Sequence, residues 1–180
     1  MENEYFDILN ENGEKTGKIK ERNKVHKDGD WHREVYIWVI NKNNEILLQR
    51  RSATKESYPN MITGSCAGHV SSGENSIDAA MRELKEELNI DTNPSELKLV
   101  KTFKKSSKHS SNFINNKFSD VYILKINKEI ENIKLQEDEV SEIFWVSYEK
   151  LKEMFYNKQQ DLLMNIGEFE ILSDFFKEER

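Results

Sequence analysis

The sequence predicts an α/β fold, also describable as α+β, in which one mixed β-sheet is sandwiched between helices. Three observations predict it: seven short strand-like segments separated by turn signals, one amphipathic helix in the middle of the chain, and two helical patterns near its end. Apolar faces on both the sheet and the helices have to be buried against each other. We therefore expect three layers, α/β/α.

The predicted strands are short runs rich in β-branched and aromatic residues. Turn residues separate them, most clearly the Asn12-Gly13 pair and the polar cluster at 41–44. The first two strands place an N-terminal strand region within residues 4–25. The predicted strands are 5–9, 17–21, 34–41, 45–50, 97–103, 121–126 and 143–146.

The central helix is predicted from about residue 76 to 88. Its apolar residues recur at helical spacing and form one stripe that should pack on a core. Asn75 or Ser76 is a suitable N-cap, and Asn89 after the last turn can take the left-handed conformation. The stripe consists of Ile77, Ala80, Met81, Leu84 and Leu88.

Two further helices are predicted in the C-terminal part, at about 147–180. The first begins with Ser147 as its cap and runs to about 157, and the second covers about 161–177. Phe175 and Phe176 are adjacent, so we expect that only one of them faces a narrow apolar stripe.

Composition indicates one domain over residues 1–180, which is long enough for a single buried core. One cysteine excludes an internal disulfide framework, and no apolar run reaches membrane-spanning length, so we expect a cytoplasmic protein without a membrane partner. The net charge of −6 argues against nucleic acid as a partner. Lysines 98, 101, 104, 105 and 108 form a local basic run that is either solvated or attracts substrate phosphates.

Three carboxylates gather on one side of the central helix, at Glu83, Glu86 and Glu87. Such a group is self-repulsive unless a cation lies among its members, and oxygen ligands suit Mg²⁺ or Mn²⁺. Glu74 lies in the loop that leads into the helix and can join them. Arg82 is spaced to hold Asp78, Glu86 or Glu74. The alternative is an ordinary solvated helix face.

The stretch 68–90 resembles the Nudix box, a glycine followed at fixed spacing by Glu, Arg-Glu, an aliphatic residue, Glu-Glu and a second aliphatic residue. One position departs from the pattern, because Asn89 replaces the final glycine, and Asn is the next best residue at positive φ. The matching positions are Gly68, Glu74, Arg82, Glu83, Leu84, Glu86, Glu87 and Ile90.

The resemblance implies a MutT-like pyrophosphohydrolase on the Nudix-type α/β/α sandwich. Such an enzyme uses Mg²⁺ or Mn²⁺ to cleave a diphosphate bond in a nucleoside diphosphate derivative or a similar small organic diphosphate. The metal ligands implied are Glu83, Glu86 and Glu87, with Glu74. The base that accepts the proton of the attacking water is either a glutamate of the box or an acid of the loop 136–139, where Glu137 and Glu139 are the candidates.

Four positions are expected to contact the substrate. Arg51 and Lys55 follow a predicted strand and can bind phosphate, whereas alternation turns Arg50 to the opposite face from Arg51. Gly68 and His69, at the start of the box, are expected at the substrate's edge.

Residues 4–147 also resemble a Nudix branch related to isopentenyl diphosphate isomerase. Isomerisation of that substrate is therefore one alternative function, and a non-catalytic diphosphate-sensing module is another. In the isomerases the reactive cysteine directly precedes Gly-His, whereas here Ala67 does, and Cys66 is one residue further back, so we expect Cys66 to be a small buried residue. His26, His32 and His69 resemble isomerase metal ligands, and without the accompanying acids we expect them to be structural hydrogen-bonding residues or residues at the substrate's edge. Whether the chain forms a homodimer stays open.

Overall fold

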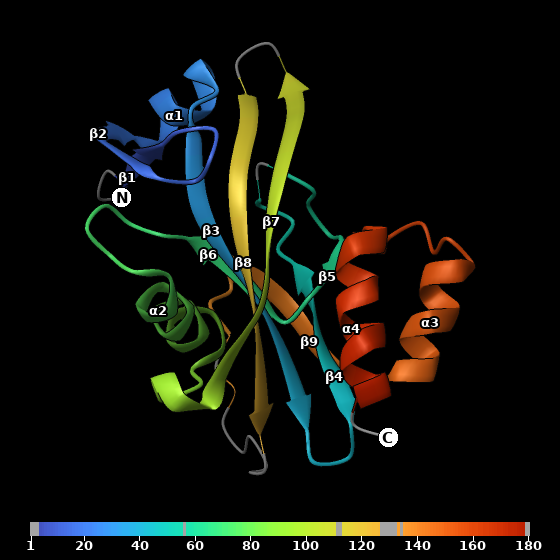
Figure 1. Ribbon diagram of the computed structural model, residues 1–180. Helices are drawn as coiled ribbons and strands as arrows, with labels where there is room; N and C mark the ends of the chain where they lie inside the picture. The colour runs from blue at the N-terminus through green and yellow to red at the C-terminus, as the bar shows by residue number, and fades with distance from the viewer. Residues whose placement is uncertain (1–3, 56, 111–112, 127–132, 134, 179–180) are drawn as a thin grey trace.

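The computed structural model describes residues 4–55, 57–110, 113–126, 133 and 135–178. Within these residues, the main elements are one long mixed sheet and four α-helices (Figure 1). The strands are β1 Tyr5–Leu9, β2 Lys15–Glu21, β3 Trp31–Asn41, β4 Glu45–Arg51, β5 Ile62–Thr63, β6 Cys66–His69, β7 Leu97–Ser110, β8 Phe113–Ile126 and β9 Val140–Ser147. The helices are α1 Arg22–Asp28, α2 Ser76–Leu88, α3 Tyr148–Tyr156 and α4 Ile166–Glu178, with a 3₁₀ turn η1 Pro94–Glu96.

Strand β3 is the centre of the sheet. It pairs in parallel with β8 along its whole length and antiparallel with β6, while β7 extends the sheet beyond β8. Strand β4 carries β9 and β5 on its two sides. The mixture of parallel and antiparallel pairs confirms the predicted mixed sheet.

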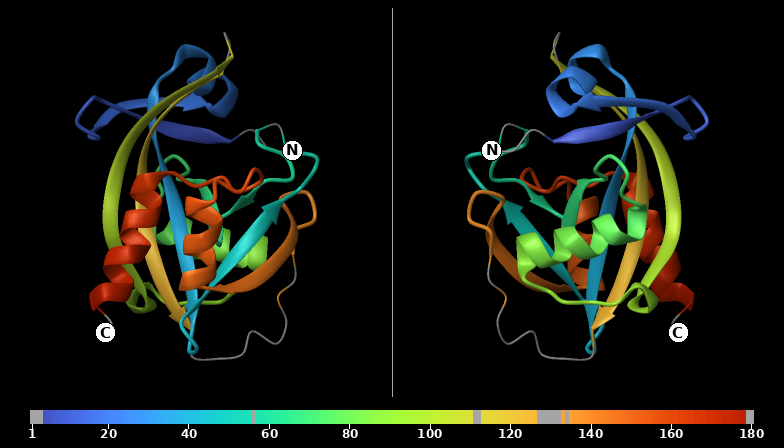
Figure 2. Two further views of the ribbon diagram at one scale, coloured as in Figure 1. Left: turned by 90° about the vertical axis from the view of Figure 1, so that its right-hand side faces the viewer. Right: turned by 90° about the vertical axis from the view of Figure 1, so that its left-hand side faces the viewer.

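Helices cover both faces of this sheet, which confirms the α/β/α fold class. Odd-numbered residues of β3, such as Val35 and Ile37, pack with α2, and even-numbered ones, such as Tyr36 and Trp38, pack with α3 and α4. Figure 2 shows α2 on one face and the α3–α4 pair on the other. The alternation of a strand thus divides the core into two apolar layers.

Strands β3 and β4 separate soon after their hairpin. Their register contains only the Ile40–Ile46 pair, and beyond it Ser65 bridges them: its hydroxyl accepts from the Val39 amide at 2.7 Å and donates to the Leu47 carbonyl at 2.7 Å. Because Ser65 is fully buried, these bonds satisfy backbone groups that no strand partner reaches. The separation opens the sheet beside β6.

The predicted strands are all present, and most of them are longer than expected. The predicted N-terminal strand region, residues 4–25, is wrong at its C-terminal end. Strand β2 stops at Glu21 and residues 22–25 begin helix α1, which ends at Gly29 in the left-handed region with φ 71°. A short helix with mixed polarity carries little periodic signal. Strands β5 and β6 were also missed, because two- and four-residue strands are too short to show alternation.

The C-terminal helix begins at Ile166, five residues later than predicted. Leu162 forms an isolated parallel bridge with Ile62, so the segment before α4 is extended along β5. Phe175 and Phe176 are both buried, and they contact different neighbours, as expected of adjacent residues that cannot share one narrow stripe. Helix α4 lies between the sheet and α3: Lys125 of β8 lies over the Phe175 ring, and Phe176 stacks on Tyr148.

Among the described residues, none of the helices combines the length and apolarity needed to cross a membrane.

Candidate active site

Helix α2 carries the predicted acidic group, and its ends lie as predicted. The Asn75 side chain accepts from the Asp78 amide at 3.0 Å, and Asn89 follows the last turn with φ 54°. Ala80, Leu84 and Leu88 are fully buried in the layer beneath the sheet. The helix is therefore a packed element with fixed ends, which holds its carboxylates in fixed positions.

The three box carboxylates differ in environment. Glu83 and Glu87 are buried, and Glu86 is exposed. Glu83 lies directly against the backbone of Gly68 in β6: a Cβ added at Gly68 would be 2.1 Å from Glu83 Oε1. A glycine is required here because any side chain would displace that carboxylate. This contact explains the first glycine of the motif.

Arg82 organises the acids around it. Its guanidinium donates to both oxygens of Glu74 at 3.0 Å, to Glu83 at 2.7 Å and to Glu86 at 3.1 Å. It also donates to the His69 carbonyl at 2.9 Å, which ties α2 to β6. Asp78 lies elsewhere, hydrogen-bonded to Asn75. The sequence spacing allowed Arg82 three partners, and the structure shows it bound to two of them, Glu74 and Glu86. It also binds Glu83.

Burial raises the pKa of both inner glutamates. The pKa of Glu83 rises to about 7, against the lowering effect of Arg82, and that of Glu87 rises to about 8, with the Glu83 charge adding to burial. Carboxylates whose pKa values are raised by burial are strongly stabilised in their charged form by a bound cation. The oxygen donors of Glu83, Glu86 and Glu87, with Glu74 nearby, fit the Mg²⁺ or Mn²⁺ that the motif implies.

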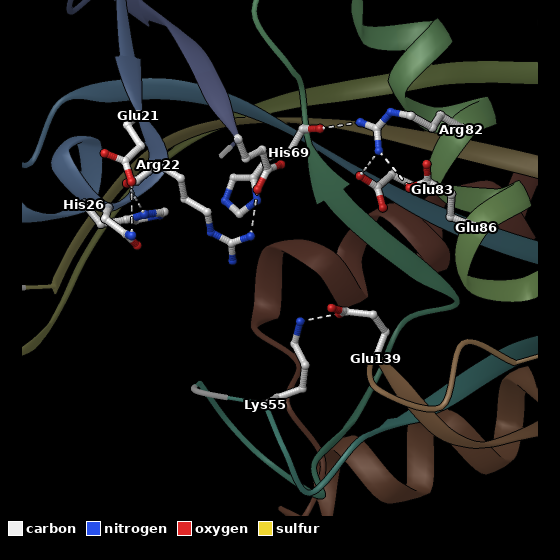
Figure 3. Close-up of polar contacts among 11 residues, drawn as sticks. Glu21, Arg22, His26, Lys55, His69, Arg82, Glu83, Glu86 and Glu139 are labelled. Carbon is white, nitrogen blue, oxygen red and sulfur yellow. Dashed lines mark hydrogen bonds and ion pairs between the residues drawn. The ribbon is translucent and has the colours of Figure 1, made fainter. Parts of the chain in front are cut away.

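The loop 136–139 lies beside these acids. The Gln136 amide donates to the Glu87 carbonyl at 3.2 Å, and the Ser52 amide donates to the Glu139 carbonyl at 2.9 Å. The Glu139 carboxylate forms an ion pair with Lys55 (Figure 3). Two of the predicted residues, Lys55 and Glu139, thus lie together beside the box acids. Glu137 is exposed on the turn.

Arg50 and Arg51 turn to opposite faces of β4, as predicted. Arg50 forms ion pairs with Glu142 and Asp161, away from the box. Arg51 donates to the Ser57 carbonyl at 2.9 Å, which orders the segment between β4 and β5. Gln49, one residue further back, donates to Glu87 at 3.3 Å and was not predicted.

Two N-terminal residues join the site although no pattern in the sequence indicated them. Arg22, at the start of α1, donates to Glu4 at 2.8 Å, and its guanidinium points into the space beside His69 (Figure 3). Charge from Glu4 contributes to the raised pKa of Glu83, and charge from Arg22 contributes to the lowered pKa of His69 after burial and His32. Only the folding of the N-terminal strands toward the box reveals this pair.

The three histidines converge on one point. Each of His26, His32 and His69 offers one ligand atom, and these atoms lie within 4.8 Å of one another. His26 Nδ1 lies 3.0 Å from the Arg22 carbonyl and His32 Nδ1 3.2 Å from the Asp30 carbonyl, consistent with structural roles. Burial lowers the pKa of His32 to about 4, so its ring is neutral and able to bind a metal.

Cys66 is fully buried, as expected. It faces α2, whereas Ala67 packs on the opposite face with Tyr36. Burial and the neighbouring Glu87 raise the pKa of its thiol well above the usual value. Both features disfavour a reactive thiolate at this position.

Comparison with known proteins shows which family this chain resembles. The family model described as the NUDIX domain matches residues 30–166. The chain is 40% identical over 156 residues to Nudix hydrolase 3 of Arabidopsis thaliana, covering 84% of this chain but only 20% of that protein. It is 37% identical over 161 residues to an uncharacterised Nudix hydrolase of Clostridium acetobutylicum, covering 88% of this chain and 77% of that protein.

An isomerase also appears among the relatives. The isopentenyl-diphosphate Delta-isomerase 2 of Photorhabdus laumondii is 36% identical over 134 residues, covering 74% of this chain and 72% of that protein. In three dimensions, a crystal structure from Deinococcus radiodurans matches with a TM-score of 0.70 at 23% identity, over 95% of this chain and 98% of the other. That likeness concerns the fold.

Proposed function

This chain belongs to the Nudix family of hydrolases, and from that premise we propose that it cleaves a diphosphate bond in a nucleoside diphosphate derivative or a similar small organic diphosphate. One observation carries the proposal: Glu83, which lies against Gly68, and Glu87 are both buried with raised pKa values, the charge of Glu83 acts on Glu87, and Arg82 donates to Glu83. Burying acids in this way is costly unless the site works with a cation.

Glu83, Glu86 and Glu87 would hold Mg²⁺ or Mn²⁺, with Glu74 contributing through the Arg82 network. When bound, the cation supplies positive charge to the diphosphate oxygens and thereby stabilises the charge that develops during cleavage. Lys55 and Arg22 have cationic ends directed toward the same space and bind the diphosphate. Arg51 supports the segment that carries Lys55.

Glu139 is our candidate for the base that takes the proton of the attacking water. Its carboxylate pairs with Lys55, and its charge contributes to the raised pKa of Glu87, so it lies within electrostatic reach of the metal acids. Glu87 itself is the alternative among the box residues. Glu137 is exposed and has no comparable support.

Isomerisation of isopentenyl diphosphate is the second candidate, and the convergence of His26, His32 and His69 favours it. Against it, the thiol of Cys66 faces α2 and has a raised pKa, and the complete set of box glutamates is of use to a hydrolase. A module that senses a diphosphate without cleaving it would not need those glutamates. Incorporation of solvent deuterium into isopentenyl diphosphate would establish the isomerase instead.

The experiment is product release by the purified chain with Mg²⁺ or Mn²⁺, using nucleoside diphosphates, nucleotide sugars, dinucleoside polyphosphates and isopentenyl diphosphate. We expect metal-dependent cleavage, and a loss of about 100-fold or more in kcat for Glu87→Gln. Glu153→Gln, on the exposed face of α3, is the matched control and should be as active as the wild type. Wild-type turnover by Glu87→Gln, or binding of a diphosphate without any product, would overturn the proposal.

The homodimer left open by the sequence is a separate question. Sedimentation equilibrium of the purified chain answers it, because a 21.3 kDa monomer and its dimer differ twofold in mass.

A further inference from the structure

Strand β4 places one amide side chain against the box acids. Gln49 is only 3% exposed, and its Nε2 donates to Glu87 Oε2 at 3.3 Å. Leu47, two residues earlier on the same strand, belongs to the apolar layer that packs with α2, so Gln49 continues the side of β4 that faces this helix. The backbone of Gln49 is paired on both sides, with Thr63 of β5 and with Ile143 of β9. The strand therefore holds the amide at a fixed place.

The carbonyl oxygen of this amide, Oε1, is buried, and no residue that the structure describes forms a hydrogen bond with it. Most buried polar atoms in folded proteins have a partner, because a buried acceptor without one costs free energy. Gln49 is thus satisfied at its nitrogen, by Glu87, and unsatisfied at its oxygen. An unpaired acceptor beside the metal acids indicates that binding at the site supplies the missing donor.

Glu87 determines which way the amide points when a cation is bound. A carboxylate has to be charged to bind a cation, and a charged carboxylate accepts hydrogen bonds but donates none. The amide therefore turns Nε2 to Glu87, and Oε1 stays free to meet a second group. The Cys66 thiol also shares a hydrogen bond with Glu87, but a thiol is a weak donor, so Gln49 is the stronger of the two.

The chemistry of the site identifies the missing donor. Mg²⁺ keeps several waters in protein sites instead of taking a shell made only of side chains. Those waters donate strong hydrogen bonds because the cation polarises them. The oxygens of an ionised diphosphate accept hydrogen bonds, so the diphosphate cannot satisfy Oε1. A water bound to the cation is therefore the donor that the proposed site brings beside Glu87.

We propose, resting on the proposed hydrolase function, that Gln49 is a positioning residue of this site: its Nε2 orients the Glu87 carboxylate, and its Oε1 accepts a hydrogen bond from a water carried by the cation. Residues that hydrogen-bond to metal ligands set the direction of those ligands in this way. Gln49 itself binds neither the cation nor the diphosphate. Its loss should weaken metal binding, whereas the metal-free fold has an unpaired acceptor here and little to lose.

The first variant is Gln49→Met, whose side chain has a similar length and no amide. Calorimetric titration of Mn²⁺, without substrate, should give a Kd about 10- to 100-fold higher than in the wild type, the range for losing a residue that supports metal ligands. The metal-free melting temperature should stay within about 3 °C of the wild type or rise, because the unpaired acceptor is removed together with a single hydrogen bond. A lower melting temperature with an unchanged Kd would show a purely structural role and overturn the proposal.

A second variant, Gln49→Glu, separates the two ends of the amide. It keeps an acceptor at the place of Oε1, loses the donor to Glu87, and adds a charge that attracts the cation. We expect Mn²⁺ to bind at least as tightly as in the wild type, and the metal-free chain to be less stable because two buried carboxylates repel each other. Binding as weak as in Gln49→Met would show that only the donor matters, and the role of Oε1 fails.

Gln159→Met is the matched control. Gln159 is exposed, lies between α3 and α4 and donates to Asp161 at 2.8 Å, away from the box acids. The same substitution there should leave the Kd for Mn²⁺ unchanged. An equal loss of affinity in Gln159→Met and Gln49→Met would overturn the proposal, because the effect would then not belong to the site.

The outcomes separate this inference from the proposed function. If Gln49→Met weakens Mn²⁺ binding but the wild type cleaves no diphosphate, the hydrolase function fails and the role of Gln49 at the metal stands. If the wild type cleaves a diphosphate and Gln49→Met binds Mn²⁺ as the wild type does, the role of Gln49 fails and the function stands. A wild type that binds no Mn²⁺ overturns both.

Discussion

At the scale of single residues, the contact between Gly68 and Glu83 decides the geometry of the acids. The strand backbone and the carboxylate approach so closely that a methyl group would overlap the oxygens. The same proximity buries Glu83 and contributes to its raised pKa. One glycine thus sets both where the acid lies and how readily it gives up its proton.

Gly68→Ala is expected to displace the Glu83 carboxylate without unfolding the chain, because the group in contact is the end of a side chain. A displacement near 1 Å costs on the order of 100-fold in kcat. Steady-state kinetics and a melting curve measure the two effects. Gly17→Ala, with φ 80° and no atom near its Cβ, is the control that strains the backbone without touching the site. Normal activity of Gly68→Ala would refute the role of this contact.

The raised pKa values of Glu83 and Glu87, about 7 and about 8, predict that metal binding and stability depend on pH. Between the ordinary glutamate pKa and these values, the folded metal-free chain holds more protons than the unfolded chain, so its stability falls as pH rises through that window. Metal displaces those protons, so its apparent affinity should increase from pH 6 to 8.5.

The measurement is the rise in melting temperature on adding Mn²⁺ at each pH. We expect the rise to be larger at pH 8.5 than at pH 6. The variant Glu83→Gln/Glu87→Gln should show little pH dependence in this range. A rise independent of pH in the wild type would contradict the assignment of these two groups.

At the scale of elements, α2 is fixed by its caps and by a contact from the N-terminal hairpin. The Asp7 carboxylate of β1 accepts from Ser72 Oγ at 2.9 Å and from the Gly73 amide at 3.1 Å. Those residues belong to the loop that carries Glu74 into the Arg82 network. Strand β1 therefore holds the loop that carries Glu74 to the box acids, although it lies more than 60 residues away in the sequence.

Asp7→Ala should loosen this loop. Loss of two hydrogen bonds to a charged acceptor is expected to cost about 1–3 kcal/mol of stability, and metal affinity should fall about tenfold because the support of the acids is weakened. Urea unfolding and calorimetric Mn²⁺ titration measure the two losses. Lys15→Met, which removes the ion partner of Asp7 but leaves the loop bonds, is the control. Equal metal affinity in Asp7→Ala and the wild type would contradict this role.

Asn89 ends α2 in the left-handed region where the Nudix pattern has glycine. Asn89→Gly should therefore be at least as stable as the wild type, whereas Asn89→Ala should lose about 1 kcal/mol, the cost of a Cβ in this conformation. Denaturant unfolding of the pair checks this. Activity should be retained in both, and equal stability of the Gly and Ala variants would show that the conformation is not the constraint.

At the scale of the whole molecule, the two faces of the sheet carry different features. The α2 face carries the acids, and the α3–α4 face carries a cavity of about 320 Å³, whose side is closed by the start of α4. The position and shape of the cavity therefore depend on how α4 packs on the sheet. Leu172, fully buried in that layer, is one of the side chains that hold it there.

Leu172→Ala is expected to destabilise the chain by about 2–5 kcal/mol, the range for a buried leucine, and to leave metal affinity unchanged, because Leu172 packs on the face opposite the acids. Chemical denaturation and Mn²⁺ titration measure these two quantities. Leu99→Ala, at an exposed position of β7, is the matched control and should change stability by less than about 0.5 kcal/mol. Weakened metal binding in Leu172→Ala would show that the two faces are not independent.

The sequence by itself determined the layers of the fold, the limits of α2 with both caps, and the clustering of three carboxylates on that helix, because helical and strand periodicity and capping are local properties. It also identified Lys55 and Glu139 without showing that they form a pair. Only the tertiary structure decided which acids are buried, since that depends on the approach of Gly68 in β6 to α2. It alone brought Asp7 and Arg22 to the box and placed Gln49 beside Glu87, because contacts between distant segments follow from packing and strand register, which no local pattern encodes.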